Sequence, residues 1–471
     1  MLFLPELIVL LGALALFMLS LGSPSSTAIR RATLGISTIA VLTTMVCLGQ
    51  KGTLFYDSYQ VNFFSQVFKF LIAAGTLIVL LFTGTSPGIK GDAKAEYHVF
   101  LLVGVLGLMM LVSSVELLAI FISLELSSFA VYIMVPMRNP AVSNPFQMES
   151  GIKYLLFGVM STGFMLFGMS YIYGLTGSTY LAEITVKLQP QFYQPAALIA
   201  LIMVMVGFFY KLAIFPFHFW VPDVYQGAAN ETTAFIAAIP KIAAVALLIR
   251  LVSLVSAEAQ VIVNLLLVCS LGSMFYGNLS ALAQTDFKRM LGYSGISHAG
   301  FVLFGLLTLQ IEGYATSIYY ITGYAVMNLT CFLVICTVAA TGENLAIKDL
   351  TGLHKRSPLL AVTLAIGLFA LAGIPPFVGF TGKFMILINA FKQGHILAVV
   401  LAAINTAIAI YYYLSVVRVA YCSDPEQKIE PIQSGAVTIS VSIVLLLIIL
   451  LMGVLPGTFL ELGTTALLSL P

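Results

Sequence analysis

The sequence predicts an all-α integral membrane protein of about fourteen transmembrane helices. Hydrophobic residues make up 60% of the 471 residues and charged residues 8%, and the mean hydropathy is +1.05. The apolar residues form continuous runs, and a run of about 20 residues matches the roughly 30 Å hydrocarbon core of a bilayer. Only helices or closed barrels satisfy the backbone in lipid, and barrel strands alternate in polarity, so these runs favour helices.

The predicted spans follow one another along the chain with short polar connections. They run over 2–22, 29–49, 61–84, 97–114, 115–136, 150–173, 195–217, 232–256, 260–283, 288–309, 314–340, 357–391, 394–421 and 435–456. The first is expected to be a retained helix because Pro5 and Glu6 stand where a signal peptide would be basic. The fourth and fifth are barely separated, and the twelfth is too long for one straight span.

Two spans carry prolines close to a lysine. In the seventh, Pro216 follows Lys211 by a few residues, and in the twelfth, Pro375 and Pro376 precede Lys383. Proline removes a backbone donor and clashes with the preceding turn, so both spans are expected to be discontinuous. Two broken spans that lie five apart predict two inverted repeats of five helices, spans 4–8 and 9–13, although prolines without a function also occur in membrane helices.

These repeats divide the chain into four predicted parts. They are an N-terminal three-helix segment (1–96), a first repeat (97–256), a second, inverted repeat (257–421) and a C-terminal helix (422–471).

Basic residues gather in the odd-numbered connections and so predict the orientation. The odd connections hold Arg30, Arg31, Lys90, Lys94, Arg138, Lys288, Arg289, Lys348, Lys355, Arg356, Arg418 and Lys428. The even connections hold Lys51, Lys187 and Lys392. The positive-inside rule then places the odd connections in the cytoplasm and both termini outside. Of the basic residues within the spans, Lys69, Lys153 and Arg250 are expected to snorkel toward helix ends.

The remaining charges inside the spans are the strongest functional signal. Glu125, Lys211, Lys241 and Lys383 lie within apolar runs, where one charge costs roughly 2.5–3.5 kcal/mol on insertion scales. Chains that keep such groups usually move ions or protons with them, and the alternative is a structural ion pair. Glu116 precedes Glu125 by nine residues, about 13 Å along a helix and on the opposite face, so the two cannot act as a carboxylate pair.

A proton relay would use these groups in a defined way. Glu125 is the expected anionic partner of Lys211, and a lysine that loses its partner in an apolar site tends to release its proton. Lys241, which follows Pro240 at the start of the eighth span, can receive that proton, and Lys383 offers a third station.

Two histidines and an aspartate are further candidates. His298 is either a relay between Lys241 and Lys383 or a hydrogen-bonded core histidine. His218 and Asp223 adjoin the break in the seventh span and belong either to an inlet path or to a loop network. The five cysteines, Cys47, Cys269, Cys331, Cys336 and Cys422, have no metal-binding spacing and are interpreted as small core residues.

The motifs around these residues resemble the antiporter-like membrane subunits of the proton-pumping NADH:quinone oxidoreductase, respiratory complex I, and among them the N-type. The resemblance covers nearly the whole chain. It rests on LPELIVLLGAL, LELSSFAVY, ESGIKYLLFG, FYKLAIFPFHFWVPDVYQGA, IPKIAAVALLIR, KRMLGYSGISHAG and LAGIPPFVGFTGKF. A lysine at position 383, where the M-type has glutamate, and the lack of a long lateral helix as in the L-type favour the N-type.

The resemblance implies a fourteen-helix fold with a hydrated polar axis at mid-membrane. It implies that Glu125 and Lys211 are the family's paired carboxylate and lysine, and that Lys241 and Lys383 are the lysines of its eighth and twelfth helices. It also implies a bacterial inner-membrane location with periplasmic termini, and M-type and K-type neighbours. NAD, FMN, iron–sulfur clusters and quinone would belong to partner subunits, with no cofactor or metal in this chain. The sequence departs from this family at GAANETTAFIA, where the family usually has a proline-containing GAPTPVTAF. This difference adds Glu231.

Three functions are therefore compared. The first is a proton-translocating membrane-arm subunit of a complex I-type enzyme, which binds membrane lipid and protons and no nucleic acid. The second is a cation/proton antiporter subunit of the Mrp type, or a complex I-like enzyme with another electron donor. The third is a passive scaffold whose buried charges only fix the packing of helices.

Overall fold

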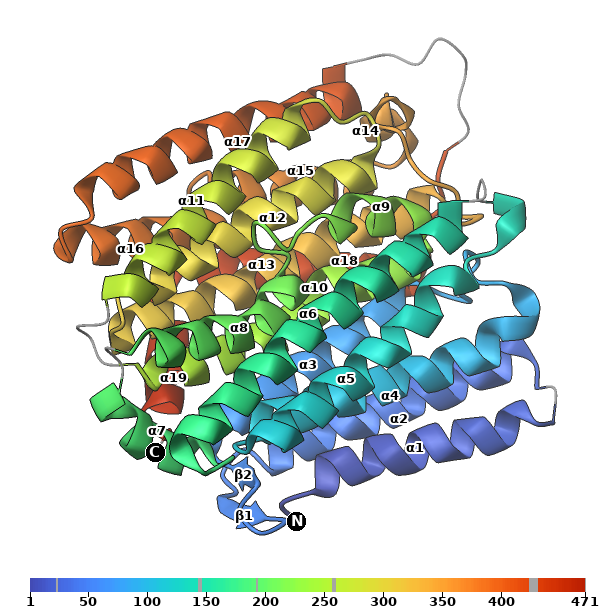
Figure 1. Cartoon of the computed structure of the whole chain (residues 1–471). Helices are drawn as coiled ribbons and strands as arrows, with labels where there is room; N and C mark the ends of the chain where they lie inside the picture. Colours follow the sequence, from blue (N-terminus) through green and yellow to red (C-terminus); the bar gives the residue numbers. More distant parts are fainter. Residues whose placement is uncertain (23, 143–145, 192–193, 256–259, 423–430, 471) are drawn as a thin grey trace.

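Every apolar run that the sequence predicts as a span coincides with helix in the computed structural model (Figure 1). The structure describes residues 1–22, 24–142, 146–191, 194–255, 260–422 and 431–470. Lys428, one of the basic residues counted above, lies outside these residues.

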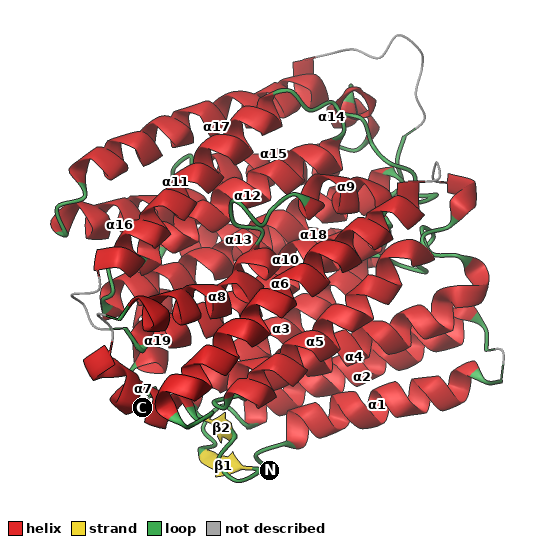
Figure 2. Cartoon of the chain, in the orientation of Figure 1, coloured by secondary structure: helices red, strands yellow, loops and turns green. Residues whose placement is uncertain are grey.

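The helices of the first half are α1 (Leu4–Ser20), α2 (Ser26–Val46), α3 (Phe63–Phe82), α4 (Lys94–Ser113), α5 (Leu117–Met134), α6 (Phe146–Thr176), α7 (Leu181–Leu188), α8 (Pro195–Leu212), α9 (Trp220–Gly227) and α10 (Asn230–Ser253). Those of the second half are α11 (Gln260–Leu282), α12 (Phe287–Leu306), α13 (Ile311–Val338), α14 (Leu353–Arg356), α15 (Pro358–Ala372), α16 (Val378–Lys392), α17 (Ile396–Cys422), α18 (Ala436–Val454) and α19 (Pro456–Leu467). One antiparallel hairpin joins β1 (Gly52–Leu54) to β2 (Tyr59–Val61) at one end of the bundle (Figure 2).

The protein is a multi-pass helical membrane protein. Among the described residues, eleven helices are long and apolar enough to cross a membrane, and α1 and α15 are shorter apolar helices. The fourth and fifth predicted spans are separate helices, α4 and α5, joined by three residues in extended or capping conformations. The number of fourteen spans and the two inverted repeats stay predictions.

Several short elements were not predicted. They are the β1–β2 hairpin, α7, α9, α14 and α19. Each is too short to give the long apolar run on which the span prediction depends. The C-terminal part, expected to hold one helix, therefore holds two, α18 and α19, which meet at Leu455.

Both predicted discontinuities are present, and each begins before its proline. Helix α8 ends at Leu212, where Ala213 adopts a left-handed conformation with φ 66°. Helix α15 ends at Ala372, where Gly373 has φ 87°. A left-handed residue stops a helix because the following amide can no longer continue the ladder. Glycine adopts this conformation freely, whereas for Ala213 it costs roughly 1–2 kcal/mol.

The centre of the bundle is formed by α10 and α13. Helix α10 is buried from Asn230 to Val252, and α13 packs against α10, α12, α15 and α16. This arrangement places the second half-helix of one break, α16, beside the central helix α13. Side chains that α10, α12 and α16 direct toward α13 can therefore meet inside the protein.

Two of the three lysine and arginine residues expected to snorkel are instead buried. Lys69 is 0% exposed and forms a 2.8 Å ion pair with Glu6 of α1. Arg250 is 4% exposed, and its guanidinium stacks on Phe64 and donates to the carbonyl of Val112. The sequence prediction was wrong for these residues because closeness to a helix end does not reveal that neighbouring helices cover that end.

Both chain ends lie at the same end of the bundle (Figure 1). The carbonyl of Met1 lies 3.8 Å from the Cys47 sulfur. Near the other terminus, the hydroxyl of Ser469 accepts from the amide of Phe64, and its carbonyl accepts from the Asn62 side chain. The two ends thus pack around the segment between α2 and α3.

Gly107 allows α4 to approach α5 closely. A Cβ atom at Gly107 would lie 2.6 Å from the amide nitrogen of Ser127 and 2.9 Å from the carbonyl oxygen of Ser123. Backbone atoms cannot move aside as a flexible side chain can. Gly163 of α6 has nothing within 4 Å of the same position.

We expect Gly107→Ala to destabilise the protein and Gly163→Ala to leave it unchanged or slightly more stable. The added methyl group at Gly107 forces the two helices apart, at a cost of about 1–3 kcal/mol. At Gly163 only the gain in helix propensity, about 1 kcal/mol, remains. The measurement is the thermal midpoint of the detergent-solubilised protein, and equal midpoints for the two variants would contradict the close packing.

Candidate functional site

Lys211 lies in the last turn of α8 and is held by two serine hydroxyls. Its Nζ atom is 3.0 Å from Oγ of Ser127 and 2.9 Å from Oγ of Ser128, both on α5. The residue is 3% exposed. Because the carbonyl groups at a helix C-terminus carry partial negative charge, this position also favours a cation.

Lys241 is held by a tyrosine of α13. Its Nζ atom lies 3.4 Å from the Tyr324 hydroxyl and 5.2 Å from the centre of the same ring. Lys241 was expected at the start of its span, but it is the twelfth of the 24 residues of α10 and lies at the middle of the helix. Pro240 does not interrupt α10, so the prediction that placed Lys241 near a helix start was wrong.

His298 of α12 is hydrogen-bonded through both ring nitrogens. Nδ1 lies 2.7 Å from the Tyr320 hydroxyl, and Nε2 lies 3.1 Å from the Tyr413 hydroxyl. The Tyr413 hydroxyl also bonds Ser294. The ring of His298 packs 5.1 Å from that of Tyr324, the residue that contacts Lys241.

Lys383 of α16 reaches back to the end of α15. Its Nζ atom donates to the carbonyl of Leu371 at 3.0 Å and to that of Ala372 at 3.2 Å. It also lies 5.1 Å from the ring centre of Phe301, which packs against Tyr320. Lys241 and Lys383 both act electrostatically on His298.

Among the residues that the structure describes, no carboxylate forms an ion pair with these three lysines. Six ion pairs occur within the described parts of the chain, and none includes Lys211, Lys241 or Lys383. Lys69 is equally buried, yet it is paired with Glu6. The three lysines instead bond neutral oxygens, which stabilise an ammonium group much less than a carboxylate does.

Glu125 lies on the same helix as the serines that hold Lys211. It is 9% exposed, and its Oε1 atom has no hydrogen-bond partner among the described residues. Lys211 acts on it electrostatically without forming an ion pair. Glu116 has a different role, since it caps α5 by accepting the Ala119 amide at 2.7 Å.

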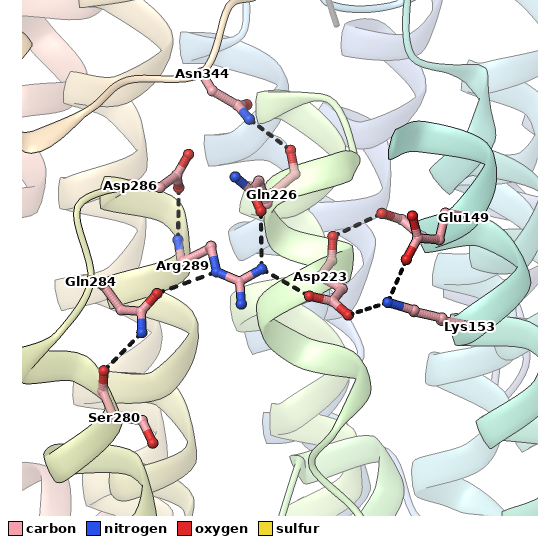
Figure 3. A network of polar contacts seen from close by, with 10 residues as sticks. Glu149, Lys153, Asp223, Gln226, Ser280, Gln284, Asp286, Arg289 and Asn344 are labelled. Atoms are coloured by element: carbon pink, nitrogen blue, oxygen red, sulfur yellow. Dashed lines mark hydrogen bonds and ion pairs between the residues drawn. The ribbon is translucent and has the colours of Figure 1, made fainter. Parts of the chain in front are cut away.

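Lys153 and Asp223 belong to a polar network near the surface that joins α6, α9 and α12 (Figure 3). Asp223 accepts from Lys153 at 2.6 Å and from Arg289 at 2.8 Å. Lys153 also pairs with Glu149 at 2.6 Å. Gln226 binds Arg289 through its side chain at 3.0 Å. These groups are partly exposed. The network therefore holds three helices together near the surface and is unlike a buried proton relay.

His218 does not join Asp223. Its ring is 0% exposed and packs against Phe215, Phe219 and Tyr276. Neither ring nitrogen has a hydrogen-bond partner among the described residues. His218 therefore lies in an aromatic environment at the α8–α9 turn.

The oxygens that hold the lysines were not identified from the sequence. They belong to Ser127, Ser128 and Tyr324, and the tyrosines at His298 are Tyr320 and Tyr413. The pair of serines directly after LEL was the available signal, but single hydroxyl residues are common in such helices. Among the described residues, no three His, Cys, Asp or Glu side chains gather as a metal site would require.

The chain is similar to several known proteins in both sequence and structure. Residues 114–409 match the family model described as NADH:quinone oxidoreductase/Mrp antiporter, transmembrane. The chain is 46% identical to NADH-quinone oxidoreductase subunit N 2 of Opitutus terrae, over 99% of this chain and 98% of that protein. It also resembles a chain of respiratory complex I from Thermus thermophilus, with a TM-score of 0.84, 28% identity and coverage of 98% and 99%. A chain of the Mrp complex from a Dietzia species shares the fold, with a TM-score of 0.86, 18% identity and coverage of 98% and 96%.

We expect Asp223→Asn to lower stability moderately and in a salt-dependent manner. The change weakens two ion pairs that join α6 and α12 to α9, and partly exposed pairs contribute about 1 kcal/mol or less each. Salt screens such pairs, so the loss is expected to shrink at high ionic strength. The thermal midpoint at low and high salt is the measurement, with Glu183→Gln, which removes an isolated exposed pair with Lys187, as control. A loss that equals that of the control at low salt would mean that the network does not hold the helices together.

Proposed function

Because the chain belongs to the NADH:quinone oxidoreductase/Mrp antiporter family of membrane subunits, we propose that it is an N-type, proton-translocating membrane-arm subunit of a complex I-type enzyme. It serves the oxidoreductase as a translocase and holds none of the redox centres itself. NAD, FMN, iron–sulfur clusters and quinone are assigned to partner subunits.

One observation carries the proposal. Lys211, Lys241 and Lys383 are buried inside the bundle and bond only neutral oxygens in the described structure. Desolvation opposes the charge of an ammonium group in such surroundings, and neutral oxygens offset this cost less than a carboxylate does. A modest change in the position of a nearby charge then decides whether the proton stays.

Glu125 and Lys211 supply the first switch. When a movement of neighbouring subunits brings Glu125 to the ammonium group, the pair holds the proton on Lys211. When Lys211 bonds Ser127 and Ser128 instead, as here, the carboxylate stabilises the charge less. The N–H bond of Lys211 then breaks, and the proton moves toward a neutral acceptor deeper in the bundle, for which we propose Lys241.

His298 supplies the link between the second and third lysines. Its ring lies against Tyr324, which contacts Lys241, and against Tyr320, which packs on Phe301 beside Lys383. A hydrogen-bonded imidazole can accept a proton at one nitrogen and release one at the other. We propose that Lys241, His298 and Lys383 form a sequence of proton acceptors on this basis.

The remaining assignments follow from the family and the charge pattern. M-type and K-type subunits are the proposed membrane-arm neighbours, and the bacterial cytoplasmic membrane is the proposed location, with both termini on its periplasmic side. The twelve basic residues of the odd connections support this orientation. The division at residues 96, 256 and 421 is proposed to separate the two repeats from the flanking helices.

The antiporter alternative is less well supported. At 18% identity, the similarity to the Mrp complex is one of fold. The relative that is 46% identical is named as an NADH-quinone oxidoreductase subunit. The scaffold alternative is tested by substitution.

We expect Lys211→Met to reduce proton pumping by about tenfold while the complex still assembles, because a proton carrier is removed and its site stays packed. Pumping is measured as NADH-driven acidification of inverted membrane vesicles, with assembly judged on native gels. The control is the double variant Glu6→Gln with Lys69→Met, which removes a buried but paired lysine and is expected to pump normally. An assembled Lys211→Met complex that pumps at the wild-type rate would favour the scaffold.

We also expect Ser127→Ala combined with Ser128→Ala to slow pumping by at least about tenfold. The two hydroxyls stabilise the separated state of Lys211, and a hydrogen bond to a charged group is worth about 1.5–3 kcal/mol. Ser161→Ala is the control, since that hydroxyl bonds only the carbonyl of Gly158 in its own helix. Equal pumping by both variants would show that the serines do not take part.

A further inference from the structure

Glu231 is a buried carboxylate for which the relay described above has no use. It lies in the first turn of α10 and is 2% exposed. Oε1 accepts the backbone amide of Gly88 at 2.9 Å, and Oε2 is buried without a hydrogen-bond partner among the described residues. A buried carboxyl oxygen without a partner is costly, so its retention needs a reason.

A structural ion pair does not supply that reason. Arg138 and Lys288 are the cations that act on Glu231, and neither forms an ion pair with it in the described parts of the chain. Arg138 donates to the carbonyls of Gln226, Gly227 and Gly342, and Lys288 donates to that of Ala228. The other titratable groups facing Glu231 are Tyr97 and Cys336.

A cavity reaches Arg138, one of the cations that act on Glu231. A half-open cavity of about 610 Å³ is lined by Arg138, Gln226, Asp286 and Asn344, among other residues. Gly88 joins Arg138 to Glu231, because its carbonyl accepts from Asn139, the residue after Arg138, while its amide donates to Glu231. A side chain at Gly88 would collide with Oε2, since a Cβ atom would lie 2.6 Å from it.

Two buried polar atoms without hydrogen-bond partners among the described residues belong to α9 and α13, which both pack against α10. Glu231 and Lys241 are ten positions apart on α10, about 15 Å along its axis. Tyr225 of α9, whose backbone carbonyl accepts from Thr233 of α10, has a buried hydroxyl with no hydrogen-bond partner in the described parts of the chain. Oδ1 of Asn328 on α13 has none there either. Asn328 donates to the Tyr324 hydroxyl at 2.8 Å, and that hydroxyl contacts Lys241.

We propose that Glu231 takes up protons from the cavity and delivers them to Lys241 through waters held by Tyr225 and Asn328. A hydronium ion in the cavity protonates Oε2 as the new O–H bond forms. That bond then breaks toward a bridging water, and an N–H bond forms on neutral Lys241 by way of the Tyr324 hydroxyl. Buried waters typically bond two to four such polar atoms. This inference rests on the proposed function and adds an inlet to the same path.

The test compares Glu231→Gln with Glu343→Gln in the assembled enzyme in inverted membrane vesicles. Glutamine keeps the acceptor for the Gly88 amide but cannot carry a proton, whereas Glu343 is a partly exposed carboxylate at the same end that also acts on Arg138. NADH-driven acidification, NADH oxidation and assembly are measured at several external pH values.

We expect Glu231→Gln to lower pumping by about tenfold at neutral pH, with partial recovery as the external proton concentration rises. Glu231→Asp is expected to restore most of the rate, and Glu343→Gln to pump normally. Wild-type pumping at every pH by an assembled Glu231→Gln enzyme overturns the inference. So does a loss of pumping that is independent of pH and not restored by aspartate, which marks a structural role.

A third variant separates this inference from the proposed function. Lys241→Met removes the acceptor itself and is expected to abolish pumping through this chain. If Lys241→Met pumps normally, the proposed function fails. If Lys241→Met fails to pump while Glu231→Gln pumps as the wild type does, only the inlet at Glu231 is wrong.

Discussion

The structure depends on ammonium groups that are held by neutral oxygens inside the helix bundle. Lys69 shows the alternative, because it is as deeply buried but bonds Glu6 directly. A direct ion pair in a low-dielectric interior resists separation, and breaking it leaves an uncompensated charge. Serine, tyrosine and backbone oxygens hold a cation less firmly. Lys211, Lys241 and Lys383 are thus held less firmly than Lys69 is.

Each of the two helix breaks lies beside one of these lysines, but the two lysines have different partners. Lys211 belongs to the helix that ends at the break, in the last turn of α8. Lys383 belongs to the helix after the break, yet its side chain returns to the last carbonyls of α15. The Lys383 ammonium group thus meets the negative end of a helix dipole and open carbonyl groups, whereas that of Lys211 bonds the hydroxyls of Ser127 and Ser128 on α5. The break between α15 and α16 therefore supplies the partners of Lys383, and a neighbouring helix supplies those of Lys211.

The sequence predicted the residues of the site better than their partners. Hydropathy alone located Glu125, Lys211, Lys241 and Lys383, because a charge in an apolar run is conspicuous. The hydroxyls that hold them come from helices distant in the chain, such as Tyr324 for Lys241, and no local pattern encodes such contacts. Lys69 was misassigned for the same reason, since its partner Glu6 lies on another helix. The break positions were predicted from prolines, but the turns begin at Ala213 and Gly373.

Buried carboxylates have different partners at the two ends of the bundle, so the two ends are not equivalent for the uptake of protons. At the end that holds both termini, Glu6 is fixed by Lys69 and by the Tyr59 hydroxyl, both on Oε1. At the opposite end, Glu231 has two cations nearby, but each donates to backbone carbonyls instead. A carboxylate whose charge is already paired is a poor proton acceptor, whereas one without a bound cation accepts a proton more readily. We therefore expect protons to pass between solvent and the central lysines at the Glu231 end of the bundle rather than at the Glu6 end.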